Sequence, residues 1–214
     1  MKNRWIAWTA MVVMGFVTVT ATAEDYMEGV EYTRISKPMR TVAEPGTIEV
    51  REYFWYGCPH CNNLEPFLQR WLDTNPKNIS LKVQPTIFRE NWAPAAQAFY
   101  TAGVLGVLDK THHAMFDAIH NDNRKNLLGD DLAMEVFFEE HGVAPADFRK
   151  AWGSFSVQSR VKQAVRMTRK SGIKGVPAVV VNGKYVTDPG IAGGYREMFK
   201  VIEYLVAKEM ASNH

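Results

Sequence analysis

Cysteine is scarce in this sequence, since 214 residues contain only Cys58 and Cys61. A small fold held together by several disulfides is therefore excluded, and so is a zinc site built from two cysteine pairs. The sequence also lacks an excess of charge beyond its first segment, because residues 24–214 carry 23 Lys and Arg against 23 Asp and Glu. A neutral chain without a long basic run has no electrostatic reason to bind nucleic acid, so we expect no nucleic-acid partner.

Long hydrophobic runs are lacking as well, and the nearest approach to one lies at the N-terminus. An uncharged run from Trp5 to Val19 follows two bases and precedes the small residues that end at Ala23. This order is typical of a secretory signal peptide. The alternative is a single membrane anchor, but the run is shorter than the roughly 20 apolar residues that a spanning helix needs. We therefore expect residues 1–23 to be a signal peptide, cleaved after Ala23, and the remaining chain to be exported.

The two cysteines form the sequence Cys58-Pro59-His60-Cys61. As a structural disulfide the pair would close almost no loop, and a disulfide across so short a loop adds little stability. A zinc site would need two further ligands at usable spacing. A Cys-x-x-Cys at the start of a helix, directly after a strand, is instead typical of a dithiol redox centre. Because export places the chain in an oxidising compartment, a Cys58–Cys61 disulfide can persist there.

The order of apolar patterns predicts a mixed α/β architecture. Strands rich in β-branched and aromatic residues are expected at 47–55, 79–88, 176–181 and 184–186, the last two joined by an Asn182-Gly183 turn. Helical periodicity predicts helices at 58–72, 154–170 and 195–210, the first of them kinked at Pro66. Between 92 and 138 we expect several short helices, broken at Gly103, Gly106, 121–123 and 129–130.

Without the helical block, this order of strands and helices is the thioredoxin arrangement. The chain resembles the DsbA family of periplasmic thiol:disulfide oxidants, in which a helical domain interrupts a thioredoxin domain. The resemblance is carried by Cys58-Pro59-His60-Cys61 after an aromatic strand, Gly175-Val176-Pro177-Ala178 before the hairpin, Val181-Asn182-Gly183-Lys184-Tyr185 around its turn and, more weakly, Ala151-Trp152-Gly153-Ser154-Phe155. It implies a thioredoxin-like domain of residues 24–87 and 164–214, interrupted by an inserted helical domain of residues 88–163.

The two cysteines differ in their expected chemistry. Cys58 lies at the start of a helix, where free backbone N–H groups and the helix dipole stabilise a thiolate, whereas Cys61 lies one turn further in and is shielded. We therefore expect Cys58 to be the exposed sulfur with a low pKa and Cys61 to be the resolving one. Pro59 offers no donor, and a cationic His60 would stabilise the Cys58 thiolate further, unless it is an ordinary solvated histidine. A stabilised thiolate favours the reduced protein and makes the disulfide a strong oxidant.

Pro177 follows Val176 at the start of an expected strand, where proline is uncommon. A cis Val176–Pro177 bond would explain this position, and the resemblance implies one beside the active site. The alternative is an ordinary trans proline at a strand start. In thioredoxin-like proteins the residue before this proline offers its backbone to a substrate chain, so the resemblance implies that Val176 and Pro177 bind substrate.

Glu52 lies in the first strand, six residues before Cys58. Alternation places it on one face with Val50 and Phe54, in apolar surroundings. The resemblance implies a buried acid here, paired with a lysine of the next strand at the position of Lys82. Such a pair would relay a proton or tune the other cysteine. The alternative is a charge that faces solvent.

A weaker candidate is formed by His113, Asp117 and His120, which share one helix face at i, i+4 and i+7. A metal site there lacks a further ligand, so we expect a solvated polar face and no metal. The redox group is then the Cys58–Cys61 disulfide itself, without a cofactor.

Together these residues favour an exported dithiol oxidase that passes the Cys58–Cys61 disulfide to unfolded or nascent exported proteins with free thiols. The alternatives are a disulfide isomerase or reductase, and a thioredoxin-fold chaperone or binding module. Isomerases usually carry a dimerisation domain, for which only about two dozen residues precede the first strand after the signal peptide. Binding alone would require neither cysteine. The resemblance implies a periplasmic monomer, re-oxidised by an inner-membrane partner of the DsbB type.

Overall fold

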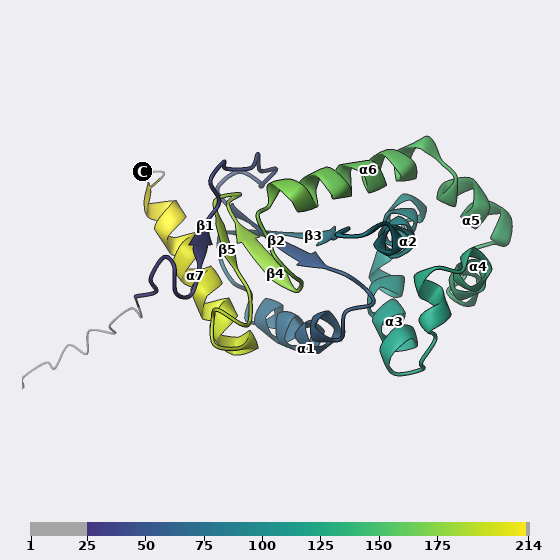
Figure 1. Cartoon of the computed structure of the whole chain (residues 1–214), viewed down its shortest axis with the longest axis horizontal. Coiled ribbons are helices and arrows are strands. Elements are labelled where there is room, and N and C mark those ends of the chain that lie inside the picture. Colours follow the sequence, from purple (N-terminus) through teal and green to yellow (C-terminus); the bar gives the residue numbers. More distant parts are fainter. Residues whose placement is uncertain (1–24, 213–214) are drawn as a thin grey trace, which may run out of the picture.

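Five strands form a single mixed sheet in residues 25–212, the part of the chain that the computed structural model describes (Figure 1). Their order across the sheet is β1-β5-β4-β2-β3. The strands are β1 (Thr33–Arg34), β2 (Ile48–Phe54), β3 (Ile79–Pro85), β4 (Ala178–Val181) and β5 (Tyr185–Thr187). Residues of β2, β4 and β5 are almost all buried, as expected for strands that are covered on both faces.

Strand β2 joins the early and the late parts of the chain. It pairs in parallel with β3 along its full length. On its other side it pairs antiparallel with β4, from Val50 opposite Val181 to Tyr53 opposite Ala178. The parallel pair requires a crossover connection, which helix α1 (Pro59–Asp73) provides. The structure thus confirms the expected order of strand, helix, strand and late hairpin.

Helices α1 and α7 (Tyr195–Ser212) pack together against one face of the sheet (Figure 1). Pro59 occupies the first position of α1, where a missing N–H is harmless, and Pro66 lies inside the helix. Trp71 of α1 stacks on Phe199 of α7, with ring centroids 4.9 Å apart. This shared core holds the start of α1 against the end of β2, where the cysteines lie.

The other face of the sheet is covered by two segments of irregular chain. Ile35 and Met39 from the N-terminal segment and Ile173 from the chain before β4 pack on Tyr53 and Val180 of the sheet. Helix α6 (Phe155–Lys170) leads from the helical block to this face.

The helical block between β3 and α6 builds a second core. It contains η1 (Glu90–Trp92), α2 (Ala93–Leu105), α3 (Leu108–His120), η2 (Lys125–Leu128), α4 (Asp131–Glu140) and α5 (Pro145–Trp152). Buried phenylalanines of these helices form one cluster that also includes Phe54, Cys58 and Cys61. The block therefore packs directly against the cysteine helix. The domain boundaries at 88 and 163 stay predictions, and α6 runs through residue 163 without interruption.

Gly103 does not break a helix, so that prediction is wrong. It lies on the exposed side of α2, where glycine costs on the order of 1 kcal/mol relative to alanine. Burial of neighbours such as Phe99 and Ala102 outweighs this cost. The break falls at Gly106, whose φ of 70° ends α2. Helix α5 and strand β1 were not predicted, because a helix of eight residues and a strand of two are too short to show a clear hydrophobic periodicity.

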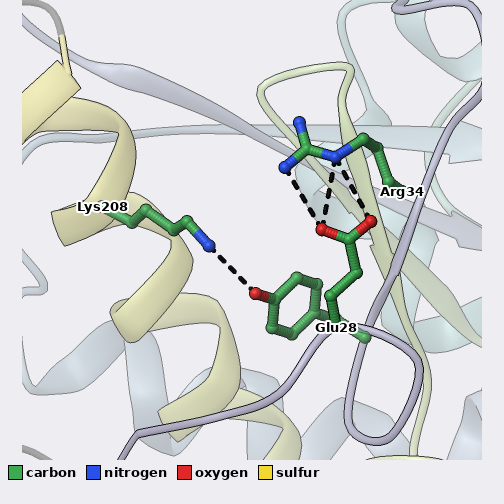
Figure 2. Close-up of polar contacts among 4 residues, drawn as sticks. Glu28, Arg34 and Lys208 are labelled. Atoms are coloured by element: carbon green, nitrogen blue, oxygen red, sulfur yellow. Dashed lines mark hydrogen bonds and ion pairs between the residues drawn. The ribbon is translucent and has the colours of Figure 1, made fainter.

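The N-terminal segment is fastened to the sheet and to α7 by polar contacts, which Figure 2 shows. Arg34 donates to the Glu28 carboxylate at 3.2–3.3 Å. Lys208 of α7 donates to the Tyr32 hydroxyl at 3.0 Å. Strand β1 itself pairs antiparallel with β5, at the edge of the sheet.

Within residues 25–212, no helix combines the length and the apolar character that crossing a membrane requires. The predicted signal peptide, residues 1–23, lies outside the described residues. Both interpretations of that segment, a cleaved signal peptide and a membrane anchor, therefore stay open, and cleavage after Ala23 stays a prediction.

Gly183 provides a test of how the hairpin is held. Its φ of 62° lies in the left-handed region, and a Cβ there would overlap the backbone oxygen of Met39. We expect Gly183→Ala to lower the free energy of unfolding by about 2–4 kcal/mol, because backbone strain and this overlap add. The matched control is Gly172→Ala, since Gly172 has a φ of 72° and open space around it. The control should lose only about 1 kcal/mol in denaturant unfolding, and equal losses would contradict the overlap.

Candidate active site around Cys58

Cys58 occupies the junction between β2 and α1. Its extended backbone, with φ −91° and ψ 114°, places it at the N-cap of α1, and its N–H donates to the Trp55 carbonyl at 2.9 Å. Pro59 follows at the first helical position. The backbone N–H groups of His60 and Cys61 then face the Cys58 sulfur. The predicted placement of Cys58 at the start of a helix is confirmed.

This environment lowers the pKa of the Cys58 thiol to about 6. The largest cause is a hydrogen bond with the Cys61 thiol. The N–H groups of Cys61 and His60 and the charge of His60 act in the same direction, whereas burial opposes them. His60 is exposed, and its charge is the smallest of these causes. A large part of Cys58 is therefore thiolate at neutral pH, the form that attacks a disulfide and leaves from one.

Cys61 has the opposite character. Burial, followed by the hydrogen bond and charge of Cys58, raises the pKa of the Cys61 thiol well above its ordinary value. Both residues are thiols in this structure, and Cys58 is 8% exposed while Cys61 is fully buried. The prediction that the Cys58 sulfur is exposed is therefore wrong, because the chain at Val176 packs beside it and leaves little of the residue open to solvent. Cys58 nevertheless remains the more accessible of the two.

The turn before β4 passes next to Cys58. The Cys58 thiol donates a hydrogen bond to the Val176 carbonyl at 3.4 Å. The Val176–Pro177 bond is cis, which confirms that expectation. A groove of about 630 Å³ beside it is lined by Val176, Pro177, His60 and Tyr195, among others. The Tyr195 hydroxyl donates to the His60 carbonyl at 3.2 Å and so ties α7 to the start of α1.

Glu52 is buried, with 1% of its surface exposed, and neither of its carboxyl oxygens has a hydrogen-bond partner among the described residues. Burial, and then the neighbouring Glu65, raise its pKa. The expected pair with Lys82 is wrong, because the register of β2 and β3 sets Lys82 opposite Arg51 and sets Val83 opposite Glu52. Successive strand residues point to opposite faces, so Glu52 and Lys82 lie on different faces of the sheet.

A cluster of titratable residues between α1 and α3 was missed in the sequence. Glu65 is buried, its pKa is raised by burial, and its carboxylate lies 2.9 Å from His113 Nδ1. His112 is mostly buried, which lowers its pKa to about 3, and its Nδ1 lies 2.8 Å from the Tyr56 hydroxyl. Glu65 could have been found from its spacing, since it follows Cys61 by four residues and therefore lies on the same face of the helix. The sequence held no comparable signal for His112.

The side chains of the three residues considered for a metal site contact different neighbours. His113 faces Glu65, and Asp117 accepts a hydrogen bond from the Asn121 side chain at 2.8 Å. His120 Nε2 lies 2.8 Å from the Tyr56 carbonyl. Each side chain is thus engaged with a different neighbour, and this geometry does not favour a shared metal.

Two tryptophans link the cysteine loop to the helical block. Trp55 and Trp92 stack with ring centroids 4.1 Å apart and planes 2° from parallel. A Cβ on Gly57 would overlap the Trp55 ring, so glycine is required between this ring and Cys58. The stack therefore fixes η1 beside the reactive cysteine.

Known proteins with the same features define the family of this chain. Residues 68–200 match the DSBA-like thioredoxin domain. The thiol:disulfide interchange protein DsbA of Azotobacter vinelandii is 37% identical, over 97% of this chain and 95% of that protein. The chain belongs to the DsbA family. It is accordingly a thiol:disulfide oxidoreductase with a thioredoxin fold and a helical insertion, which confirms the predicted activity and fold class.

Solved DsbA structures agree with this assignment. The structure of Pseudomonas aeruginosa DsbA is 37% identical, with a TM-score of 0.80 over 88% of this chain and 96% of that chain. The oxidoreductase DsbA of Xylella fastidiosa is 31% identical, with a TM-score of 0.80 over 87% of this chain and 98% of that chain.

The low pKa of Cys58 makes the stability of the reduced protein depend on pH. Its folded pKa of about 6 lies below its ordinary value of 9.0, so the stabilisation is complete above pH 9 and is lost as pH falls through 6. Between pH 5 and pH 8 the contribution should grow by about 2.5 kcal/mol. We expect the difference in unfolding free energy between reduced wild type and Cys58→Ser to grow by this amount. Parallel pH profiles of the two proteins would contradict the shift.

The hydrogen bond from the Cys61 thiol can be tested in single-thiol variants. Cys61→Ala removes the donor and should raise the Cys58 pKa by about one unit or more. Cys61→Ser keeps an O–H donor and should leave the Cys58 pKa within about half a unit of wild type. Ultraviolet titration of the thiolate measures both values. If Ala and Ser give the same pKa, the helix terminus rather than Cys61 stabilises the thiolate.

Proposed function

We propose that this chain is an exported dithiol oxidase, which donates the Cys58–Cys61 disulfide to exported proteins. The observation that carries this proposal is the position of the Cys58 sulfur. It lies at the N-terminus of α1, with its thiol 3.4 Å from a backbone carbonyl that borders an open groove. One sulfur is thus both activated and reachable, while its partner is buried.

The reaction proceeds by two exchanges. A substrate thiolate attacks the Cys58 sulfur of the disulfide, which forms a mixed disulfide and releases Cys61 as a thiolate that takes up a proton. A second substrate thiolate then attacks the substrate sulfur of the mixed disulfide and releases the Cys58 thiolate. The substrate is oxidised and the cysteine pair is reduced by two electrons. The low pKa of Cys58 makes it a good leaving group in the second exchange.

Val176 and Pro177 are the proposed substrate-binding residues. They line the groove next to Cys58, so an extended substrate segment can lie along their backbone, as an added strand does. Pro59 and His60 complete the cysteine motif: Pro59 starts the helix, and the charge of His60 favours the thiolate.

Glu52 is the proposed proton relay for Cys61. Its carboxyl group is buried without a partner, and burial favours its neutral, protonated form. A neutral Glu52 can give its proton to the Cys61 thiolate when the disulfide opens. Lys82 has no part in this step, because it lies on the other face of the sheet.

The proposed setting of the reaction is the periplasm. The substrates are unfolded or nascent exported proteins with free thiols, and the redox group is the protein's own cysteine pair. An inner-membrane partner of the DsbB type would restore the disulfide, and the chain would act as a monomer. The relatives named as thiol:disulfide interchange proteins support this setting at the level of the family.

Exchange with glutathione tests the roles of the two cysteines. Cys61→Ala should form a mixed disulfide with oxidised glutathione at Cys58 rapidly, because the thiolate is populated at pH 7. Cys58→Ala should react at least about 100-fold more slowly, because Cys61 is buried and its pKa is raised. Mass spectrometry of the adducts gives both rates, and equal rates would remove Cys58 from its proposed role.

The same exchange separates an oxidase from a reductase or isomerase. At equilibrium with glutathione, wild type should hold its dithiol form far more readily than a thioredoxin does, because the thiolate is stabilised. His60→Ser should make the pair slightly more reducing, since His60 is the smallest cause of the low pKa. A wild-type equilibrium equal to that of thioredoxin would contradict the oxidase proposal.

A further inference from the structure

The bases of this chain gather in one stretch of its sequence. Residues 148–187 contain nine Lys and Arg and no Asp or Glu, whereas residues 109–147 contain nine Asp and Glu and three Lys and Arg. Because the chain after residue 23 is neutral as a whole, the molecule is electrically polarised. The proposed exchange chemistry uses none of these bases.

Helix α6 carries four of these bases on one side. They are Lys162, Arg166, Arg169 and Lys170, all of them exposed. The opposite side of the helix carries Ala164 and Thr168, which are buried. Like charges three and four residues apart on a helix repel each other, and α6 contains no acidic residue that would offset the repulsion. A negatively charged surface placed against this side would offset it.

A groove extends this basic side onto the N-terminal segment. It lies between the last turn of α6 and residues 33–40, has a volume of about 680 Å³, and contains no acidic residue in its lining. Its cations are Arg34, Lys37, Arg40, Arg169 and Lys170. Arg34 is paired with Glu28 (Figure 2), but no salt bridge within residues 25–212 engages the other four. We call Lys37, Arg40, Lys162, Arg166, Arg169 and Lys170 the basic surface.

The basic surface reaches the edge of the active site. Lys174 follows Lys170 by four residues, is exposed, and lines the groove that contains Val176, Pro177 and His60. A partner seated on the basic surface would therefore leave the reactive sulfur uncovered.

We propose that the basic surface binds the anionic phospholipid headgroups of a bilayer. This inference rests on the proposed export and on re-oxidation by a membrane partner, which together place the protein beside such a bilayer. The same segment exposes Val42, which is 61% exposed and follows Arg40 by two residues. Basic residues combined with an exposed apolar side chain are typical of proteins that lie on a membrane surface.

The charge distribution also sets an orientation on the bilayer. Lipid phosphates attract the basic surface and repel the acidic residues between 109 and 147, most of which lie on α3 and α4. Figure 1 shows α6 and α3 on opposite sides of the molecule. Helix α3 would thus point away from the lipid, and so would the start of α1 that carries Cys58, because α1 packs against α3 and lies on the same side of the molecule in Figure 1.

Vesicle binding of the chain from residue 24 tests the proposal. Wild type should bind vesicles of equal parts phosphatidylglycerol and phosphatidylcholine at 0.1 M salt, should not bind pure phosphatidylcholine, and should be released at 0.5 M salt. Each cation near an anionic surface strengthens binding on the order of fivefold. The triple variant Lys37→Gln/Arg169→Gln/Lys170→Gln should therefore bind at least about tenfold more weakly.

The matched control is Lys77→Gln/Lys110→Gln/Lys125→Gln, which changes the net charge equally at exposed bases elsewhere. It should bind within about threefold of wild type. Equal weakening in both triples, or no binding by wild type, would overturn the proposal. Displacement by inorganic phosphate at constant ionic strength, or equally tight binding to polyglutamate, would also overturn it in favour of a general anion site or an acidic protein.

The glutathione equilibrium keeps this test separate from the proposed function. Both triple variants should match wild type in that equilibrium, because their substitutions lie outside the cysteine site. If the protein bound vesicles but had a glutathione equilibrium like that of a thioredoxin, the oxidase proposal would be overturned and the lipid-binding proposal would be supported. An oxidising equilibrium without vesicle binding would overturn the lipid surface alone.

Discussion

The antiparallel pairing of β2 with β4 is the constraint on which the active site depends. It places Cys58, at the end of one strand, beside Val176, before the start of the other, although 118 residues separate them in sequence. The helical block occupies most of the chain between these strands and packs back on the cysteine helix through the cluster that contains Cys61. The sulfur is thereby held between a fixed helix terminus and a fixed carbonyl, and its reactivity follows from both.

Different hydrogen-bond donors make the two cysteines unequal. Burial acts against the thiolate at both sulfurs, but only Cys58 has the donors of a helix terminus and a thiol to overcome it. The nearby carboxyl groups of Glu52 and Glu65 fit this arrangement, because burial raises their pKa values and favours their neutral forms. Two ionised carboxylates in the same place would repel the Cys58 thiolate and weaken it as a leaving group.

The sequence was sufficient for the elements with long, clear patterns: β2, α1, β3, α6, the late hairpin and α7. The cysteine motif was likewise predictable, because its chemistry is local, and the cis proline was expected from its place at a strand start and from the family resemblance. The predictions that failed concerned features that depend on tertiary structure. Strand register decided that Lys82 and Glu52 lie on different faces, packing kept Gly103 inside α2, and the fold of the block brought His112 and His113 to Glu65. None of these outcomes follows from residue spacing alone.

The long separation of β2 from β4 has a consequence for folding during export. Helices α2 to α6 pack mainly on one another, so the block can form once α6 has emerged, whereas β2 must wait for β4 to close the sheet. A chain that emerges N-terminus first therefore presents its cysteines long before Val176 arrives. The substrate site is assembled last, and a nascent copy of this protein is itself a dithiol chain that a finished copy can oxidise.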